Sequence, residues 1–272
     1  MICMRSFIKD FLPPIAFRAI QCLRGRDTIF KGDYKSWKEA ASKCSGYDAN
    51  NILAKVLVAT LKVKNGDAAF ERDSVVFNKI EYSWPVLAGL MSAGARNSGV
   101  LNVLDFGGAL GSSYFQNRKF LKDLPEVRWN VVEQAHFVKA GQEHIQDKHL
   151  RFYPTIDACL AENQPNVVLL SSVLQYLPEP AGVLNLLAEI KASTLILDRT
   201  SYANFGVKST IKIQTVPPEI YTARYPCRFF SENEIIAVLA RHHYALLETF
   251  PSLDKLDPTA TWKGHIFTLQ TE

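Results

Sequence analysis

The sequence predicts an α/β protein built on a doubly wound, mostly parallel seven-stranded sheet, with a helical region at its N-terminal end. Three observations support this prediction. From Leu101 onward, short apolar runs of strand length alternate with longer segments of helical periodicity. The first run ends in a glycine-rich turn, "DFGGALG", which leads into a helix. Such alternation is typical of a parallel sheet with helices on both faces.

The predicted strands follow one another after residue 100. They read LNVLDFG, RWNVVEQ, LRFYP, NVVLLSS, STLILDRT, YALLETF and GHIFTLQ. Helical segments separate the first six of them, and the last helix begins at Ser231 with Glu234 in capping-box spacing. We assign residues 100–272 to this domain. Within it, residues 200–230 form a long irregular insertion rich in Tyr, Pro and Arg, and such a loop commonly recognises the substrate.

Two further segments precede the sheet. Residues 27–99 have mostly helical patterns, and we expect Tyr82 and Trp84 within them to be buried, either in a helix docked on the sheet or in a lid over a ligand. Residues 1–26 contain two basic amphipathic helical stretches separated by a Pro pair. A wide apolar face of this kind is typical of an interfacial membrane anchor, and also of a helix that packs on the body or on a second subunit.

Composition and charge restrict the class of function. The chain has 272 residues, 47% of them apolar and 21% charged, which is typical of a soluble globular domain. Residues 1–72 carry 13 Lys and Arg against 7 Asp and Glu, whereas the rest carries 18 against 20, so nucleic acid is not the expected partner. The five cysteines include no CxxC pair and the histidines show no ligand spacing, which predicts no metal site. We expect a cytoplasmic protein, because no membrane span or signal peptide is recognisable.

The glycine turn predicts a nucleotide-type ligand at the carboxyl ends of the strands. Neither the G-x-G-x-x-G spacing of dinucleotide sites nor the phosphate-loop pattern is present. Asp105 at the tip of the first strand would repel a diphosphate, but it suits a ligand that carries an ammonium and a sulfonium group. Glu133 at the tip of the second strand suits the two hydroxyls of a ribose. Taken singly, Asp105 could instead be a helix cap and Glu133 a solvated strand end.

These motifs resemble the class I S-adenosylmethionine-dependent methyltransferases. The resemblance covers residues 100–270 and includes the D-x-G-x-(G/A)-x-G turn, the acid that closes strand two and the strand-four segment "VVLLSSVLQYLPEP". It implies S-adenosylmethionine as cofactor. In this interpretation the glycines approach the methionine part, Asp105 takes its amino group directly or through water, and Glu133 holds the ribose. The implied cofactor-binding residues are Asp105, Phe106, Gly107, Gly108, Gly111, Tyr114, Glu133, Gln134, Tyr153, Ser171, Ser172 and Val173.

A closer resemblance extends from about Phe30 to the end of the chain. Segments such as "GDYKSWKEAASKCSGYDA", "FNKIEYSWPVLAGL" and "VPPEIYTARYPCRFFSE" are similar to a bacterial family of methyltransferases encoded among surface-polysaccharide genes, such as those for O-antigen or capsule. This resemblance implies a sugar hydroxyl on a surface glycan, or on its nucleotide- or lipid-linked precursor, as the methyl acceptor.

A hydroxyl acceptor calls for a general base, and Asp198 at the end of strand five is our first choice. Its alternative role is a structural cap or an ion pair with Arg199. We expect aromatic and arginine side chains near the insertion to bind the acceptor, namely Arg199, Tyr202, Tyr221 and Tyr225.

Two other functions remain open at this point. One is a nicotinamide-dependent sugar oxidoreductase, which Asp105 and the glycine spacing disfavour. The other is a non-catalytic scaffold with a methyltransferase fold in a glycan assembly complex, which the intact cofactor motif disfavours. A homo-oligomer and a peripheral contact with the inner face of the cell membrane through residues 1–26 are further expectations.

Overall fold

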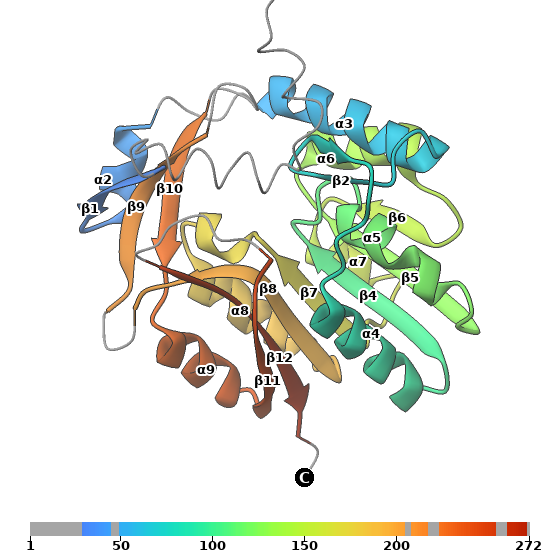
Figure 1. Cartoon of the computed structure of the whole chain (residues 1–272). Helices are drawn as coiled ribbons and strands as arrows, with labels where there is room; N and C mark the ends of the chain where they lie inside the picture. Colours follow the sequence, from blue (N-terminus) through green and yellow to red (C-terminus); the bar gives the residue numbers. More distant parts are fainter. Residues whose placement is uncertain (1–28, 45–48, 205–207, 217–222, 254–259, 271–272) are drawn as a thin grey trace, which may run out of the picture.

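A computed structural model describes residues 29–44, 49–204, 208–216, 223–253 and 260–270 of the chain. Their centre is a seven-stranded sheet with the strand order β11-β12-β8-β7-β4-β5-β6 (Figure 1). The bounds of its strands are β4 Val100–Phe106, β5 Glu126–Val132, β6 Leu150–Tyr153, β7 Val167–Ser171, β8 Thr194–Tyr202, β11 Tyr244–Pro251 and β12 Thr261–Leu269.

The strands from β8 to β6 pair in parallel, whereas β12 runs antiparallel to both β8 and β11. Sequential strands lead outward from β4 to β6, and the chain then returns to β7 on the other side of β4. The direction of winding therefore reverses between β4 and β7. This is a doubly wound, mostly parallel seven-stranded sheet, and it confirms the predicted α/β fold class.

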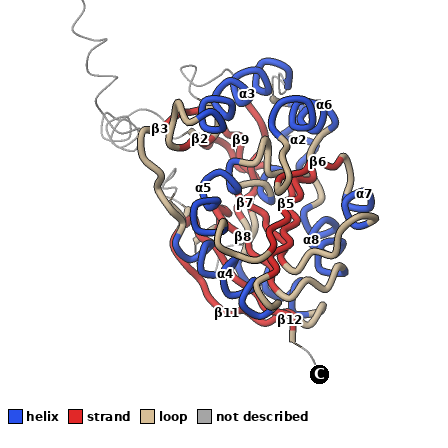
Figure 2. The backbone as a smooth tube through the Cα atoms, turned by 90° about the vertical axis from the view of Figure 1, so that its right-hand side faces the viewer, coloured by secondary structure: helices blue, strands red, loops and turns tan. Residues whose placement is uncertain are grey.

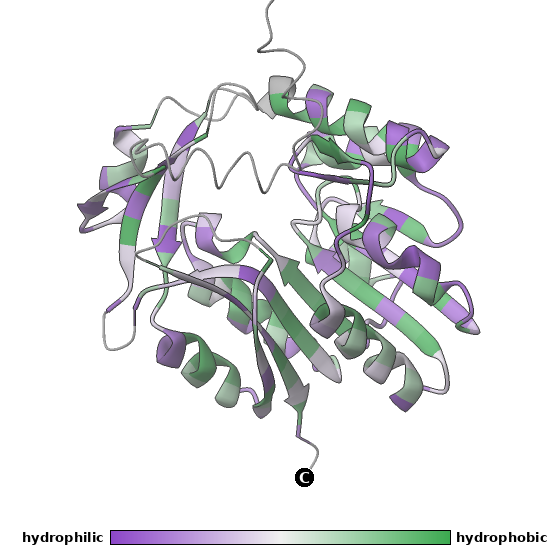
Figure 3. Cartoon of the chain, in the orientation of Figure 1, coloured by the Kyte–Doolittle hydropathy of each residue, from purple (hydrophilic) through white to green (hydrophobic). Residues whose placement is uncertain are grey.

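Helices cover both faces of this sheet because its strands are apolar on both sides. Successive residues of β7 illustrate this: Val167 and Leu169 face the layer of α3, α4, α5 and α6, whereas Val168 and Leu170 face the layer of α7, α8 and α9. In Figure 3 the central strands are correspondingly mostly apolar. The helices are α2 Trp37–Ser42, α3 Ala49–Asn65, α4 Trp84–Arg96, α5 Ser112–Leu121, α6 Ala135–Ala140, α7 Ile156–Leu160, α8 Pro180–Glu189 and α9 Glu232–Ala240.

The segment predicted to be an irregular insertion contains regular structure. Strands β9 (Thr210–Thr215) and β10 (Arg224–Phe229) form an antiparallel pair, and β1 (Phe30–Tyr34) joins the free edge of β9. Ile211 and Ile213 of β9 pack against Ala40 of α2, which fixes the register by burying one face. We call α2 together with β1, β9 and β10 the accessory lobe (residues 29–44, 208–216 and 223–230). It stands beside the carboxyl end of the central sheet (Figure 1).

The region 27–99 is likewise less helical than predicted. Besides α2, α3 and α4 it contains β1 and a short hairpin, β2 (Phe70–Arg72) and β3 (Val75–Phe77). The hairpin lies next to α3 in both views (Figures 1 and 2). The sequence "FERDSVVF" explains it, because apolar residues flank the turn at Asp73 and Ser74, which both have positive φ.

The expected burial of Trp84 is wrong. Its exposed fraction is 58%, whereas Tyr82 is half-buried, and both rings stack with Phe120 of α5 on the surface. Pro85 at the start of α4 accounts for this, because Trp84 is the first residue of the helix and precedes its buried face. Among the described helices, none combines the length and apolarity that crossing a bilayer requires. The predicted helices of residues 1–26 lie outside the described residues.

Candidate functional site

The glycine turn predicted from sequence joins β4 to α5 at the carboxyl end of the sheet. Gly107 has a φ of +70°, and a Cβ added there would lie 2.4 Å from Cγ2 of Val173. Gly111 has a φ of +90°, and its added Cβ would lie 2.8 Å from the side chain of Leu150. Only glycine combines these backbone angles with such close approach. The structure thereby brings the glycine turn and the Val173 segment after β7 together, as the two sides of one cradle.

Asp105 does not face this cradle. Its side chain is completely buried below the turn, where Oδ2 accepts a hydrogen bond of 2.9 Å from Nε1 of Trp129, and a Cβ on Gly108 would collide with its carboxyl group. Its other oxygen, Oδ1, has no hydrogen-bond partner among the described residues. Burial raises the pKa of Asp105 from 3.8 to about 7, the Trp129 hydrogen bond lowers it, and nearby Glu133 raises it further. The contact of Asp105 with a ligand's amino group, directly or through water, stays a prediction.

The predicted ribose acid stands at the expected place. Glu133 directly follows β5 and is partly buried, and its carboxylate accepts a hydrogen bond from the backbone N–H of Gln134. Burial raises the pKa of Glu133, and this hydrogen bond opposes the rise. Gln134 itself is exposed at the start of α6, and Phe106 at the end of β4 is half-buried. Glu133 is thus held by the backbone N–H of Gln134, the N-cap residue of α6, at the end of the strand next to β4.

Two aromatic residues assigned to the cofactor are occupied elsewhere. The hydroxyl of Tyr153, at the end of β6, donates a hydrogen bond to Glu162 and accepts one from Asn163. These contacts place the hydroxyl beside the end of α7. Tyr114 of α5 is buried in the core against Trp129, with ring centroids 5.9 Å apart. The sequence showed their place along the chain but not their side-chain directions.

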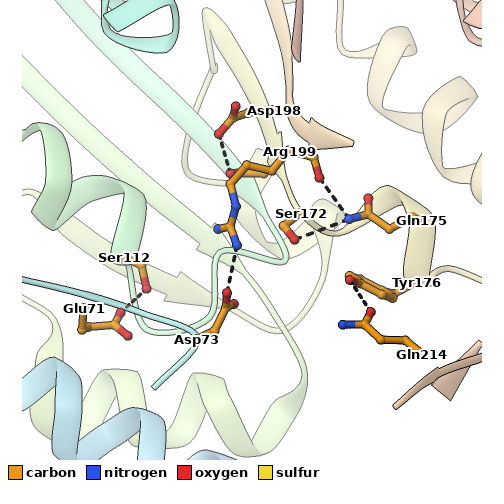
Figure 4. A network of polar contacts seen from close by, with 10 residues as sticks. Glu71, Asp73, Ser112, Ser172, Gln175, Tyr176, Asp198, Arg199 and Gln214 are labelled. Atoms are coloured by element: carbon orange, nitrogen blue, oxygen red, sulfur yellow. Dashed lines mark hydrogen bonds and ion pairs between the residues drawn. The ribbon is translucent and has the colours of Figure 1, made fainter. Parts of the chain in front are cut away.

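The carboxyl ends of β7 and β8 form a polar network (Figure 4). Ser171 donates a hydrogen bond of 2.9 Å to Oδ2 of Asp198. The side chain of Gln175 donates to the backbone oxygen of Arg199 at 3.0 Å and lies 3.4 Å from the hydroxyl of Ser172. Ser172 and Arg199 have φ values of +59° and +53°, and such strained residues are common at functional sites.

Asp198 and Arg199 lie inside β8 rather than after it, because this strand continues to Tyr202. Asp198 is aligned with Ser171 in the parallel pair and therefore still stands at the end of β7. Its exposed fraction is only 6%. The guanidinium of Arg199 forms an ion pair of 2.9 Å with Asp73 in the turn of the β2–β3 hairpin.

Two acids of the β2–β3 hairpin were missed by the sequence analysis. Asp73 reaches β8 through Arg199, while Glu71 accepts a hydrogen bond from the hydroxyl of Ser112, the first residue of α5. Figure 4 shows both contacts from the same hairpin. Burial raises the pKa of Glu71 from 4.5 to about 7, the Ser112 hydrogen bond lowers it, and the charge of Asp73 raises it. The turn signal in "FERDSVVF" could have revealed the hairpin, but not its place over the sheet.

The three tyrosines assigned to the acceptor have different outcomes. Tyr225 of β10 stacks edge-on against Tyr176, with centroids 5.2 Å apart, and Tyr176 donates to Oε1 of Gln214 at 2.9 Å. This cluster joins the accessory lobe to the segment after β7. Tyr202, by contrast, is 1% exposed and its hydroxyl meets His265 in the core, so it does not line the site. Tyr221 lies outside the described residues.

The accessory lobe is strongly basic. It contains eight Lys and Arg residues and two acids, a net charge of +6, although the whole chain has only +4. The cations are Lys31, Lys35, Lys38, Lys43, Lys208, Lys212, Arg224 and Arg228, and the acids are Asp33 and Glu39. An anionic molecule approaching the carboxyl end of the sheet from this side would meet an attractive field.

No protein-family model and no curated protein sequence matches the chain. Solved structures share its architecture at low identity. The N-terminal domain of EvdMO1, crystallised in the presence of SAH and D-fucose, is 12% identical with a TM-score of 0.49, covering 82% of this chain and 98% of that one. Magnesium protoporphyrin IX methyltransferase (ChlM) from Synechocystis PCC 6803, with bound SAM, is 14% identical with a TM-score of 0.45, covering 99% of both chains. The glycopeptide N-methyltransferase MtfA, complexed with sinefungin, is 11% identical with a TM-score of 0.45, covering 68% and 94%.

Proposed function

We propose that the protein is an S-adenosylmethionine-dependent methyltransferase that transfers the methyl group to a sugar hydroxyl. The observation that carries the proposal is the cradle at the carboxyl end of β4, where Gly107 touches Val173 and Glu133 ends the neighbouring strand. At these glycines an added Cβ would collide with side chains of the chain itself, so the turn packs tightly against the strand ends, which is where ligands bind in open α/β sheets. The buried carboxylate oxygen of Glu71 that has no partner among the described residues fits a cationic ligand better than a dinucleotide diphosphate.

The residues divide the work of binding among three strand ends. Glu133 accepts hydrogen bonds from the ribose hydroxyls, and Gly107, Gly108 and Gly111 let the backbone contact the methionine part. Asp105 supports the turn from below through Trp129. When bound, S-adenosylmethionine supplies a methyl group on a positively charged sulfur. A nucleophile attacks the methyl carbon in line with the carbon–sulfur bond, and the sulfur leaves.

Asp198 is the proposed general base for the acceptor. A sugar hydroxyl is a weak acid, so its proton must leave to a positioned base as the new carbon–oxygen bond forms. Ser171 fixes the orientation of the Asp198 carboxylate, and Oδ2 is the oxygen it engages. The hydroxyl proton therefore ends on Asp198 and passes to water after the transfer. Positioning of the acceptor against the methyl group supplies most of the remaining acceleration.

The accessory lobe supports an anionic acceptor. Its net charge of +6 and the aromatic pair Tyr176 and Tyr225 combine the chemistry that binds phosphate or carboxylate with rings that stack on sugar faces. A nucleotide- or lipid-linked sugar, or a uronate-containing glycan, has both features. The resemblance to methyltransferases of surface-polysaccharide gene clusters favours such a precursor as the substrate.

The proposed cofactor is tested by calorimetric titration with S-adenosylhomocysteine. We expect micromolar-range binding to the wild type and roughly 10-fold or weaker binding to Glu133→Gln, because a ribose hydrogen bond to a charged group is lost. Glu143→Gln is the matched control, since Glu143 is an exposed acid of the turn after α6. Binding of NADH, with none of S-adenosylhomocysteine, would instead establish the oxidoreductase alternative.

The proposed base is tested with labelled methyl transfer to polysaccharide precursors. Asp198→Asn should lower kcat by roughly 100-fold or more while the affinity for S-adenosylhomocysteine stays unchanged. Cofactor binding with no transfer to any precursor would favour the scaffold alternative.

The proposed membrane contact through residues 1–26 has its own test. The full chain should bind vesicles that contain anionic lipid, and a chain lacking residues 1–26 should not. If the full chain stays in solution, the segment packs on protein instead.

A further inference from the structure

The β2–β3 hairpin bridges the carboxyl edge of the sheet. Glu71 contacts Ser112 at the start of α5, and Asp73 is paired with Arg199 of β8 at 2.9 Å. Strands β4 and β7, with the glycine turn between them, lie between these two anchor points in the sheet. The hairpin therefore reaches from the start of α5 to β8, with Glu71 beside Ser112 and Asp73 beside Arg199 (Figure 4).

Glu71 is the acid best placed to receive a positive group. Its exposed fraction is 1%, and its oxygen Oε2 has no hydrogen-bond partner among the described residues, although a backbone contact with Ser74 also favours the ionised form. A buried carboxylate with one unsatisfied oxygen is unfavourable unless a cation or donor joins it. The charge of Arg199 lowers the pKa of Glu71, while its guanidinium forms the ion pair with Asp73.

Ser112 sets the direction of the ligand. It begins α5 directly after Gly111, so its hydroxyl stands among the first N–H groups of the helix, at the positive end of the helix dipole. A free amino acid carries an anion and a cation on one carbon. Its carboxylate suits these N–H groups, and its ammonium then needs an acid within a few ångströms on the same side. Glu71, which accepts a hydrogen bond from Ser112, is such an acid on this side, whereas Asp105 is completely buried below the turn.

We propose that Glu71 binds the ammonium group of the methionine part of S-adenosylmethionine, while Asp105 acts only in supporting the turn. This inference rests on the proposed function, because it assigns a partner within the same ligand site. It makes Glu71 a residue that distinguishes the amino-acid-bearing cofactor and its product from adenosyl thioethers that lack the amino acid.

The test compares two ligands by calorimetry at pH 8, where Glu71 is mostly ionised. S-adenosylhomocysteine carries the amino acid, and 5′-methylthioadenosine lacks it. Glu71→Gln should weaken the binding of S-adenosylhomocysteine by roughly 10- to 100-fold, the range for a lost hydrogen bond to a charged group, and should leave 5′-methylthioadenosine unchanged. The matched control is Glu81→Gln, an exposed acid that precedes α4, which should change neither affinity.

Two outcomes overturn the inference. If Glu71→Gln weakens both ligands by the same factor, Glu71 shapes the cradle as a whole; if it weakens neither, the ammonium lies elsewhere. Should Glu71→Gln fail to fold, Glu71→Asp keeps the charge but shortens its reach, and it should show the same selective loss. A wild type that binds neither ligand overturns the proposed function itself, which is a different result from an unselective variant.

Discussion

At the residue scale, the carboxyl edge of the sheet contains two acids in opposite situations. Asp105 is hydrogen-bonded to Trp129 below the glycine turn, whereas Glu71 lies above it beside Ser112. Burial is the main cause of the raised pKa of both groups, to about 7 in each case. Each acid is therefore partly protonated near neutral pH in the unliganded protein, and a cation at the site would favour its ionised form.

The buried Asp105 gives the stability a predictable pH dependence. Its folded-state pKa is raised from 3.8 to about 7, so its contribution to stability is present below pH 3.8 and is lost as the pH rises through 7. Asp105→Asn is neutral throughout and keeps an acceptor for Trp129. We expect the variant to melt at least about 2 °C above the wild type at pH 8, with a smaller difference at pH 5. A difference in melting temperature between the variant and the wild type that stays the same from pH 5 to pH 8 would contradict the raised pKa of Asp105.

Gly107 should tolerate no side chain. Gly107→Ala combines a positive φ with a collision of its Cβ with Val173, and we expect a loss of about 2 kcal/mol or more in the free energy of unfolding. Gly182→Ala on α8 is the control, because an added Cβ there meets nothing within 4 Å; stability should be unchanged or up to about 1 kcal/mol higher. Chemical denaturation measures both.

Adding Val173→Ala to the Gly107→Ala variant should restore part of the loss, since it removes the colliding methyl groups. Strict additivity of the two changes would mean that the glycine turn and the Val173 segment do not touch.

At the scale of elements, the β2–β3 hairpin and the accessory lobe determine what the end of the sheet can bind. The hairpin and the lobe both consist of short segments. Each of these segments packs against residues that are distant in the sequence. The hairpin is tied to β8 by the Asp73–Arg199 ion pair, whose side chains are 47% and 14% exposed. Such a half-exposed pair contributes modestly, so the hairpin is expected to open more readily than the sheet.

Removing this ion pair should loosen the hairpin alone. In Asp73→Asn we expect amide hydrogen exchange over residues 70–77 to be roughly 2- to 5-fold faster, while exchange in β4 and β7 is unchanged. Asp157→Asn at the start of α7 serves as the control, because it lies on another element. Unchanged exchange in the hairpin would show that Arg199 does not hold it.

At the scale of the whole molecule, the accessory lobe and the central sheet share hydrophobic contacts, and Trp262 makes the contact with Phe30 and Phe229. Trp262 of β12 packs against Phe30 and Phe229, with centroids 5.8 and 6.2 Å apart. The lobe also joins the segment after β7 through Tyr176 and Gln214. Because β1 and β9 come from opposite ends of the chain, the lobe can form only when the body has brought them together.

Trp262 should therefore couple the unfolding of the accessory lobe to that of the central sheet. We expect Trp262→Ala to lower the free energy of unfolding by about 3–5 kcal/mol, in a single transition seen by both near- and far-ultraviolet circular dichroism. Trp262→Phe keeps an aromatic ring and removes a buried N–H that has no partner among the described residues, so its cost should be clearly smaller. Two separate transitions in the wild type would show that the lobe folds on its own.

The sequence by itself determined the succession of strands and helices along the chain after residue 100, the glycine turn and the position of Glu133 at a strand end. These follow from local signals, because apolar periodicity and turn chemistry act within a few residues. Tertiary structure alone decided that β1 pairs with β9, that Trp84 is exposed, and that Asp105 is buried against Trp129 while Glu71 contacts Ser112. These features depend on packing between segments far apart in the chain, and no local pattern records which side of a strand end a carboxylate will face.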